Sequence, residues 1–326
     1  MDLQLGQAAS RGGAPGAVCS GFTSARCRGN REGGEITSLS RNDGPAFGAH
    51  AFIWAGEWTR EGAGRVISGA AEAGLDFVEI PLLNPGSMDV EHTRSLLDHH
   101  GLGCSCSLAL PREFHLPFNP EGAGHFLEEA VQTTAALGSP VLTGCLYTHL
   151  GTLTGKPPKP AELEAVARVL KETARRAADS GVELGIEAVN RYETYLLNLA
   201  SQAGELLDRI DEPNVFVHLD TYHMNIEEKG FYEPIVSLGS RLGYIHLSES
   251  DRGTPGTANV HWDEVFRGLE EIDYDGALAM ESFAAVNEAI VGATALWRDV
   301  VGDPDALVRD GLAFLRTRAR EHGVLS

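Results

Sequence analysis

The feature that most constrains the fold of this chain is a rhythm that begins near Phe47, where short apolar runs alternate with longer amphipathic stretches. Short apolar runs bounded by turn formers are typical of buried strands, and apolar residues recurring at spacings of three and four are typical of helices packed on a sheet. The predicted strands span residues 47–54, 75–82, 103–110, 139–146, 182–188, 215–220, 242–249 and 276–282. The predicted helices span residues 60–74, 88–100, 121–137, 161–181, 198–210, 262–271 and 303–320.

The stretch 161–181 illustrates the helical pattern. Gly181 is positioned to end it, as glycine commonly does after the last helical turn. One face of the stretch carries Leu163, Val166, Val169 and Leu170. Eight such strands with helices between them, over roughly 250 residues, predict an α/β fold consisting of a single (β/α)8 TIM barrel. A doubly wound sheet is the alternative, but no GxGxxG motif follows a predicted strand and opens a helix.

Residues 1–45 differ from the rest of the chain. They are rich in Gly, Ser, Ala and Arg, as in GAPGAVCSGFTSARCRGNREGG, and show neither helical nor strand periodicity. A composition of this kind is typical of a segment that cannot bury a core of its own. We therefore predict a disordered extension over 1–45 and one TIM-barrel domain over 46–326. A transit peptide is the alternative, and Glu32, Glu35 and Asp43 argue against it.

The overall charge excludes one class of partner. The chain has 326 residues, 43% of them hydrophobic, and a formal net charge of -20. The hydrophobic content is ample for a sizeable core. A strongly acidic surface repels phosphate backbones, so we expect no nucleic acid partner.

Cysteine usage and hydropathy indicate the compartment. The five cysteines are odd in number and form no CxxC pair, so a disulfide framework is not expected in a chain of this length and the pattern indicates the reducing cytoplasm. Two of them, Cys104 and Cys106, alternate within an apolar run and are predicted to be small core residues. No run approaches the ~18 apolar residues of a membrane span, and the N-terminus lacks the apolar core of a secretory signal.

Metal-competent side chains stand near the carboxyl ends of four successive predicted strands: Glu187, Asp220, His246 and Glu281. These strand ends converge on one mouth of a TIM barrel, so we expect the four groups to meet. Any one of them alone is more often a helix cap, a salt-bridge partner or a satisfied interior histidine. Burying three carboxylates together without a cation, however, is very costly. The set suits Mn²⁺, Mg²⁺ or Co²⁺, and Zn²⁺ is less favoured because no cysteine accompanies it.

The segments that follow these strands are polar, and they carry Glu193, His223 and Arg252. Loops in this position build the active sites of TIM barrels. Each residue taken singly also fits an ordinary role: an acid at a helix N-terminus, a turn residue and a solvated loop charge, respectively.

Several of these stretches resemble the D-tagatose 3-epimerase family, which includes the D-psicose (allulose) and L-ribulose 3-epimerases. The resemblance is carried by GIEAVNRYETYLLN, LDTYHMNIEE, IHLSESDRGTPG with Trp262-Asp263 beyond it, and YDGALAMESF followed by LWRD. It runs from about Phe47 to the C-terminus, is densest over 182–299, and is looser in FGAHAFIWAGEW.

The resemblance implies a function and a role for each site residue. The family inverts C3 of a free ketose of the D-tagatose, D-fructose/D-psicose or L-ribulose class through an enediolate. The family's ligands for one divalent ion, expected to be Mn²⁺ with Co²⁺ or Mg²⁺ as alternatives, fall on the four strand-end residues named above. Glu187 and Glu281 would be the catalytic acid/base pair on opposite faces of the sugar. The family's sugar-binding residues fall on Glu193, His223 and Arg252. The resemblance also implies a homodimer or homotetramer.

The chain departs from the family pattern where the substrate tail would lie. His50 stands where the family usually has an aromatic residue in its first strand, and Leu150 stands roughly where it often has a tryptophan. The preferred sugar is therefore open.

Three alternatives share the barrel. An aldose–ketose isomerase or a hydroxypyruvate-isomerase-like enzyme would use a similar metal set and move a proton between neighbouring carbons. A DNA-repair endonuclease would need several zinc ions and duplex binding, which the charge disfavours. A non-catalytic sugar-binding barrel would need no pair of proton-transfer groups.

Overall fold

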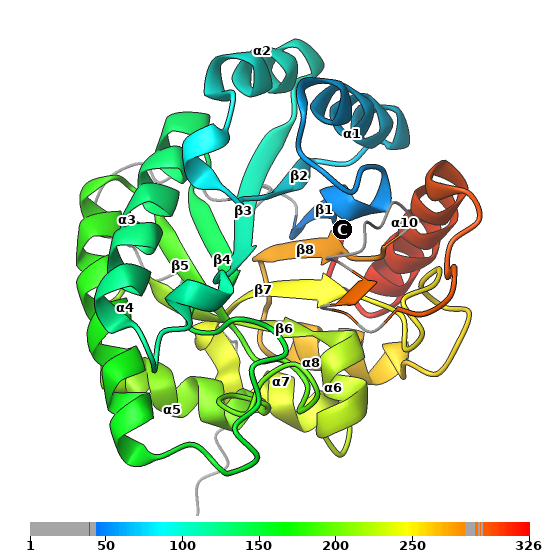
Figure 1. Cartoon of the computed structure of the whole chain (residues 1–326). Coiled ribbons are helices and arrows are strands. Elements are labelled where there is room, and N and C mark those ends of the chain that lie inside the picture. The colour runs from blue at the N-terminus through cyan, green and yellow to red at the C-terminus, as the bar shows by residue number, and fades with distance from the viewer. Residues whose placement is uncertain (1–38, 40–43, 284–290, 293, 295) are drawn as a thin grey trace, which may run out of the picture. The chain divides into compact units, whose positions relative to one another are not determined.

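Eight parallel strands close into a barrel in the order β1 to β8. The computed structural model describes residues 39, 44–283, 291–292, 294 and 296–326, which lie in a compact unit spanning Ile36–Ser326. Helices cover the outside of the barrel, and the last of them lies beside the first (Figure 1). This confirms the predicted TIM barrel. Residues 1–38 and 40–43 of the expected extension lie outside the described residues, so its division from the barrel at residue 46 stays a prediction.

The strands lie within the predicted ranges, apart from β1, which begins one residue earlier. The first strand is shorter than predicted because the His50 side chain accepts the N–H of Phe52 and turns the chain into a 3-10 helix, Ala51–Ile53. The strands are β1 Ala46–His50, β2 Phe77–Pro81, β3 Gly103–Ala109, β4 Val141–Cys145, β5 Glu183–Glu187, β6 Val215–Asp220, β7 Leu242–Leu247 and β8 Ala277–Met280.

All seven predicted helices are present, with bounds within two residues of the prediction. They are α1 Arg60–Ala73, α2 Val90–His100, α3 Pro120–Leu137, α4 Pro160–Asp179, α5 Ala200–Ile210, α8 Trp262–Glu271 and α10 Pro304–Glu321. Two further helices between β6 and β7 were not predicted, α6 Thr221–Glu227 and α7 Tyr232–Leu238. Each has seven residues, which is too short to display helical periodicity in the sequence.

The inside of the barrel is apolar toward the amino ends of the strands. There Phe77 and Tyr244 pack in a buried cluster, and Gly48 makes room for the Phe77 ring, which a Cβ at that position would approach to 2.4 Å. The cluster, called here the apolar floor, consists of Ala46, Phe77, Val141, Tyr244, Ala277 and Ala279. Toward the carboxyl ends the buried side chains become polar. The barrel therefore holds a hydrophilic chamber above an apolar base.

A larger core lies between the strands and the surrounding helices. Cys104 and Cys106 are buried in it as free thiols, which confirms that they are small core residues. Among the described residues, no helix combines the length and apolar character that a bilayer span requires.

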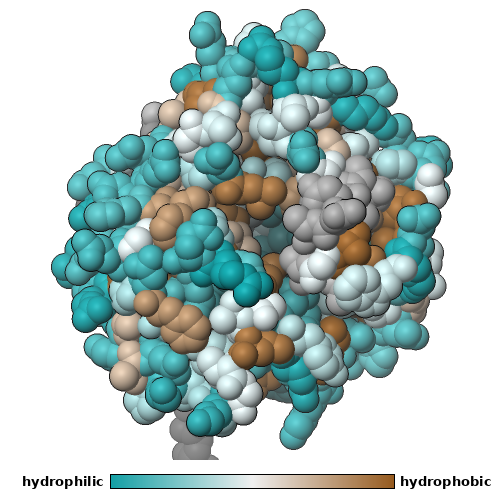
Figure 2. Space-filling view, viewed as in Figure 1, coloured by the Kyte–Doolittle hydropathy of each residue, from teal (hydrophilic) through white to brown (hydrophobic). Residues whose placement is uncertain are grey.

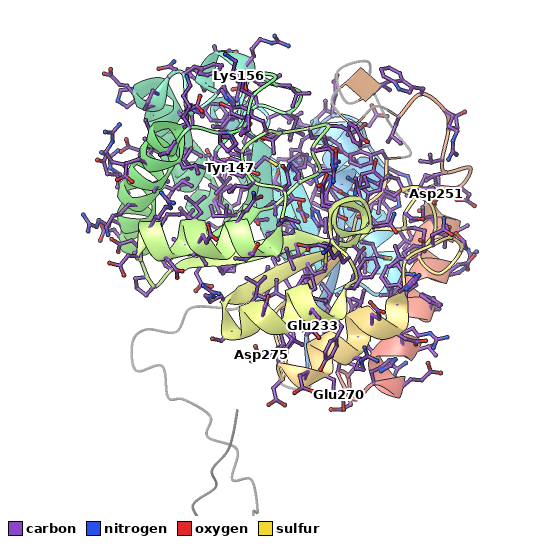
Figure 3. All side chains as sticks on the ribbon, turned by 90° about the horizontal axis from the view of Figure 1, so that it is seen from below. Tyr147, Lys156, Glu233, Asp251, Glu270 and Asp275 are labelled. Atoms are coloured by element: carbon purple, nitrogen blue, oxygen red, sulfur yellow. The ribbon has the colours of Figure 1, made fainter. Side chains whose placement is uncertain are left out.

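The carboxyl and amino ends of the strands lie on opposite sides of the barrel. Figure 3 shows this with Lys156, in the loop after β4, and Asp275, just before β8, at opposite ends of the molecule. On the face viewed in Figure 2, hydrophobic residues gather around the centre, whereas the outer helices are mostly hydrophilic. Four of the large apolar side chains that are exposed, Leu83, Phe118, Leu153 and Tyr192, follow strands β2 to β5. They therefore lie along one part of the rim at the end of the barrel where TIM-barrel sites are found.

Candidate metal centre

The four predicted ligands lie at the carboxyl ends of neighbouring strands. Glu187 and Asp220 are the last residues of β5 and β6, His246 lies one residue before the end of β7, and Glu281 directly follows β8. The parallel pairing of β6 with β7 places Asp220 beside His246 in register. The first three are at most 7% exposed, and the Glu281 side chain is 11% exposed. The closed sheet thus gathers four side chains that are far apart in the sequence.

The imidazole of His246 is the centre of this cluster. Its Nδ1 lies 3.6 Å from Glu187 Oε1, 3.7 Å from Asp220 Oδ2 and 3.7 Å from Glu281 Oε2. This nitrogen is buried and has no hydrogen-bond partner in the described part of the chain. The other ring nitrogen, Nε2, lies 2.7 Å from Glu79 Oε2 and donates its proton there. An orphaned nitrogen lone pair that faces three carboxylate oxygens fits a divalent cation.

Three overlapping groups of potential ligand atoms occur among the described residues, each with its atoms within 4.8 Å of one another. One contains Asp220, His246 and Glu281. The second adds Glu187 to His246 and His218, and the third joins Glu187 to Asp220 and His223. Together the groups contain three carboxylates and three histidines, a mixture of oxygen and nitrogen donors that suits borderline divalent ions.

Burial perturbs the ionisation of all three carboxylates. It raises the pKa of Glu187, although the facing imidazole of His246 partly offsets the effect. It also raises the pKa of Glu281 to about 8, against the opposing influence of Arg252 and His246. Burial alone would raise the pKa of Asp220 as well, but the Arg252 guanidinium and neighbouring imidazoles hold it well below its ordinary value. Desolvation thus outweighs the neighbouring positive charges at Glu187 and Glu281, whereas those charges outweigh desolvation at Asp220.

Arg252 enters this site from the loop after β7. It is 3% exposed, and its Nη1 donates to Asp220 Oδ2 at 2.7 Å and to Glu281 Oε2 at 2.5 Å. The guanidinium lies over the Tyr222 ring, 4.0 Å from its centroid. The backbone at Arg252 has a φ of 64°, a left-handed conformation that is unfavourable for a residue with a Cβ. The surrounding loop must hold it there.

Glu249 supplies that support, and sequence reasoning missed its role. Its carboxylate accepts the backbone N–H groups of Gly256 at 2.8 Å and Val260 at 3.0 Å, and the indole N–H of Trp262 at 3.1 Å. The Arg252 N–H in turn donates to the Glu249 carbonyl at 2.9 Å. This one buried carboxylate ties both ends of the loop to the barrel.

Asn190 holds the other two predicted sugar-binding residues and was also missed. Its side-chain amide donates to Glu193 Oε1 at 2.8 Å and to His223 Nδ1 at 2.9 Å. His223 Nε2 is thereby directed at Glu187 Oε1, 3.8 Å away. Burial lowers the pKa of His223 to about 3 and raises that of Glu193 to about 7. All seven predicted site residues are therefore brought to one chamber.

A cavity of about 470 Å³ opens beside this chamber, and Tyr222, Asp251, Arg252 and Trp297 are among the residues that line it. His50, which departs from the family pattern, lies inside the barrel with its Nε2 3.4 Å from Ser107 Oγ and 3.6 Å from Glu79 Oε1. Leu150 is partly exposed in the loop after β4. The cavity meets the chamber at Arg252 and provides room for a small molecule there.

Comparison with known proteins agrees with the fold. Residues 67–318 match the family model of the xylose isomerase-like TIM barrel. The chain is 38% identical over 278 residues to an L-ribulose 3-epimerase of Methylomonas sp. (strain DH-1), an alignment that covers 83% of this chain and 97% of the relative. It is 36% identical over 278 residues to a ketose 3-epimerase of Arthrobacter globiformis, with 83% and 96% covered. A crystal structure of D-allulose 3-epimerase from Methylomonas sp. in complex with D-allulose matches with a TM-score of 0.82 at 36% identity, covering 86% of this chain and 99% of that one. The chain belongs to the ketose 3-epimerase family within the xylose isomerase-like TIM barrels.

Proposed function

We propose that this protein is a metal-dependent ketose 3-epimerase that inverts C3 of a free ketose. The observation that carries the proposal is the buried, unpartnered Nδ1 of His246 with three carboxylate oxygens within 3.7 Å of it. A sugar-binding protein without catalysis has no need of this arrangement. The relatives that it resembles are named for epimerisation of L-ribulose, D-allulose and other ketoses.

The ion would be held by the strand-end ligands Glu187, Asp220, His246 and Glu281. We propose Mn²⁺, with Co²⁺ or Mg²⁺ as alternatives, because the set contains three carboxylates and a single nitrogen. When bound, the ion polarises the ketose carbonyl and stabilises the negative charge that develops on the neighbouring oxygens.

Glu187 and Glu281 would exchange the C3 proton. Inversion requires one group to remove the proton from one face of the carbon and another group to return a proton from the other face. Burial raises the pKa of both carboxyl groups, whereas a bound cation would lower it, so the two opposing effects together would set their proton affinity. Cys145 Sγ, 3.9 Å from Glu187 Oε2, and the Arg252 guanidinium at Glu281 orient the two side chains.

Glu193, His223 and Arg252 would bind the sugar oxygens O1 to O3. They offer one acceptor and two donors, and Asn190 fixes the first two in place. This polarity suits the hydroxyl-rich end of a ketose and leaves its tail toward the cavity beside Arg252. We also propose a homodimer or homotetramer, and a cytoplasmic location in keeping with the free thiols of Cys104, Cys106 and Cys145.

The test is hydrogen exchange at C3. The protein is incubated with Mn²⁺ in D₂O with a panel of ketohexoses and ketopentoses, and deuterium at C3 is followed by NMR. We expect exchange and formation of the C3 epimer with at least one ketose. Glu187→Gln and Glu281→Gln should each abolish both while leaving the circular dichroism spectrum unchanged. The matched control is Glu233→Gln, an exposed residue on α7 (Figure 3), which should behave as wild type.

Two results would contradict the proposal. An aldose as the primary product would make the protein an isomerase, and full C3 exchange in either glutamate variant would remove that residue from the acid/base pair.

A further inference from the structure

Glu79 is a fully buried carboxylate inside the barrel that the sequence did not single out. It lies in the middle of β2, on the same face of the strand as Phe77, and is 0% exposed. Its Oε2 lies 2.7 Å from His246 Nε2 and accepts the hydroxyl of Tyr244 at 2.7 Å. Both donors belong to β7, across the barrel from β2. Glu79 therefore links the opposite wall directly to a proposed metal ligand.

The Glu79 carboxylate is held in turn by Tyr244 and Ser105. The Tyr244 hydroxyl lies 2.9 Å from Ser105 Oγ, so a chain of hydrogen bonds runs from Ser105 through Tyr244 to Glu79 and on to His246. Ser105 is the register neighbour of Glu79 on β3. Tyr244 also belongs to the apolar floor, which fixes its ring by packing. The groups that hold the carboxylate are thus themselves buried and held by hydrogen bonds or packing.

We propose that Glu79 is the positioning residue of the metal centre: by accepting the Nε2–H of His246 it fixes the imidazole with Nδ1 facing the three strand-end carboxylates. The inference rests on the proposed metal site but not on any step of sugar chemistry. A hydrogen bond to one ring nitrogen determines which nitrogen keeps its lone pair, and it also holds the plane of the ring. A negative charge behind the imidazole makes the free nitrogen a stronger donor to a cation.

A purely structural role explains this carboxylate poorly. Glu79 Oε1 is buried and has no hydrogen-bond partner in the described residues; His50 Nε2 is 3.6 Å away. Burying a charge with one oxygen unpaired costs stability, and an apolar side chain of similar size at such a position is often neutral or more stable. A role in holding His246 accounts for this buried carboxylate better than structural support does.

The effect is measured as metal affinity rather than as turnover. Free Mn²⁺ is quantified by electron paramagnetic resonance during titration of wild-type and Glu79→Gln protein. Glu79→Gln removes the negative charge behind the imidazole, although the amide oxygen can still accept the Nε2–H. Mutating an outer partner of a ligand histidine typically weakens metal binding about 10–100-fold, and we expect a rise of that size in the dissociation constant. The matched control is Glu228→Gln, a half-buried carboxylate that accepts the Ala200 N–H at 2.9 Å and should leave Mn²⁺ binding unchanged.

The same substitution in a His246→Ala protein distinguishes an effect through His246 from a general loss of structure. If Glu79 acts through His246, the Glu79→Gln change should weaken Mn²⁺ binding no further in a His246→Ala protein. A dissociation constant within twofold of wild type for Glu79→Gln alone, or an equal loss in both backgrounds, would overturn the proposal.

The wild-type protein gives an independent test that does not depend on the variant folding. Protein labelled with ¹⁵N-histidine and loaded with diamagnetic Zn²⁺ should show His246 protonated at Nε2 and coordinated through Nδ1. Coordination through Nε2 would overturn the proposal. The experiments distinguish the epimerase activity from the positioning role of Glu79. Tight Mn²⁺ binding without C3 exchange would contradict the epimerase activity. Normal exchange together with unchanged Mn²⁺ affinity in Glu79→Gln would contradict only the role of Glu79.

Discussion

Replacing Arg252 by alanine should destabilise the metal-free protein far more than the metal-loaded one. The guanidinium is buried and bonded to two carboxylates, Asp220 and Glu281. Removing one partner of a buried ion pair typically costs about 3–5 kcal/mol, because the remaining charge is left uncompensated. At roughly 2–4 °C of melting temperature per kcal/mol for a domain of this size, Arg252→Ala should lower the melting temperature by about 6–20 °C in the presence of chelator.

A bound divalent cation would supply the missing positive charge, so the loss should shrink when the same variant is melted with excess Mn²⁺. The assay is thermal unfolding followed by circular dichroism, with and without metal. Arg309→Ala is the matched control, because Arg309 pairs with Asp310 at the surface with 66% and 60% of the two side chains exposed, and such pairs contribute at most about 1 kcal/mol. The reasoning would be refuted by a chelated Arg252→Ala protein that melts within about 2 °C of wild type, or by a loss that Mn²⁺ leaves unchanged.

Three further predictions follow from the site and the barrel. Chelation should abolish C3 exchange and Mn²⁺ or Co²⁺ should restore it; activity that survives complete chelation would count against the metal. Burial raises the pKa of Glu193 from 4.5 to about 7, so the folded state binds the Glu193 proton more tightly than the unfolded state does. The free energy of unfolding should therefore fall as the pH rises from about 4.5 to 7, by about 3 kcal/mol. Glu193→Gln should flatten this fall in a series of melting curves, and an unchanged slope would exclude Glu193 as its source. Gly48→Ala places a Cβ 2.4 Å from the Phe77 ring and should cost about 1–3 kcal/mol in urea unfolding, with part of the loss recovered by adding Phe77→Leu.

Some of the missed residues have a signal in the sequence and some do not. Glu79 is a carboxylate within an apolar strand, in the same phase as Phe77 and Pro81, so the alternation of β2 places it inside the barrel. Its partner cannot be deduced in this way, because Tyr244 and His246 lie more than 160 residues away in sequence. Asn190 follows Glu187 by three residues, but only the path of the loop after β5 shows that its amide bridges Glu193 and His223.

The sequence by itself determined the alternation of strands and helices, the closed barrel and the four side chains at neighbouring strand ends. The strands and helices follow from local periodicity, which short stretches of sequence show directly. The four side chains follow from the rule that parallel strands of a barrel end on the same side. Only the tertiary structure decided that the free nitrogen of His246 faces three carboxylates, that Arg252 is buried against two of them, and that Glu79 contacts the imidazole from across the barrel. These contacts join residues from different strands at distances of a few ångströms, and the closure and packing of the whole sheet set such distances.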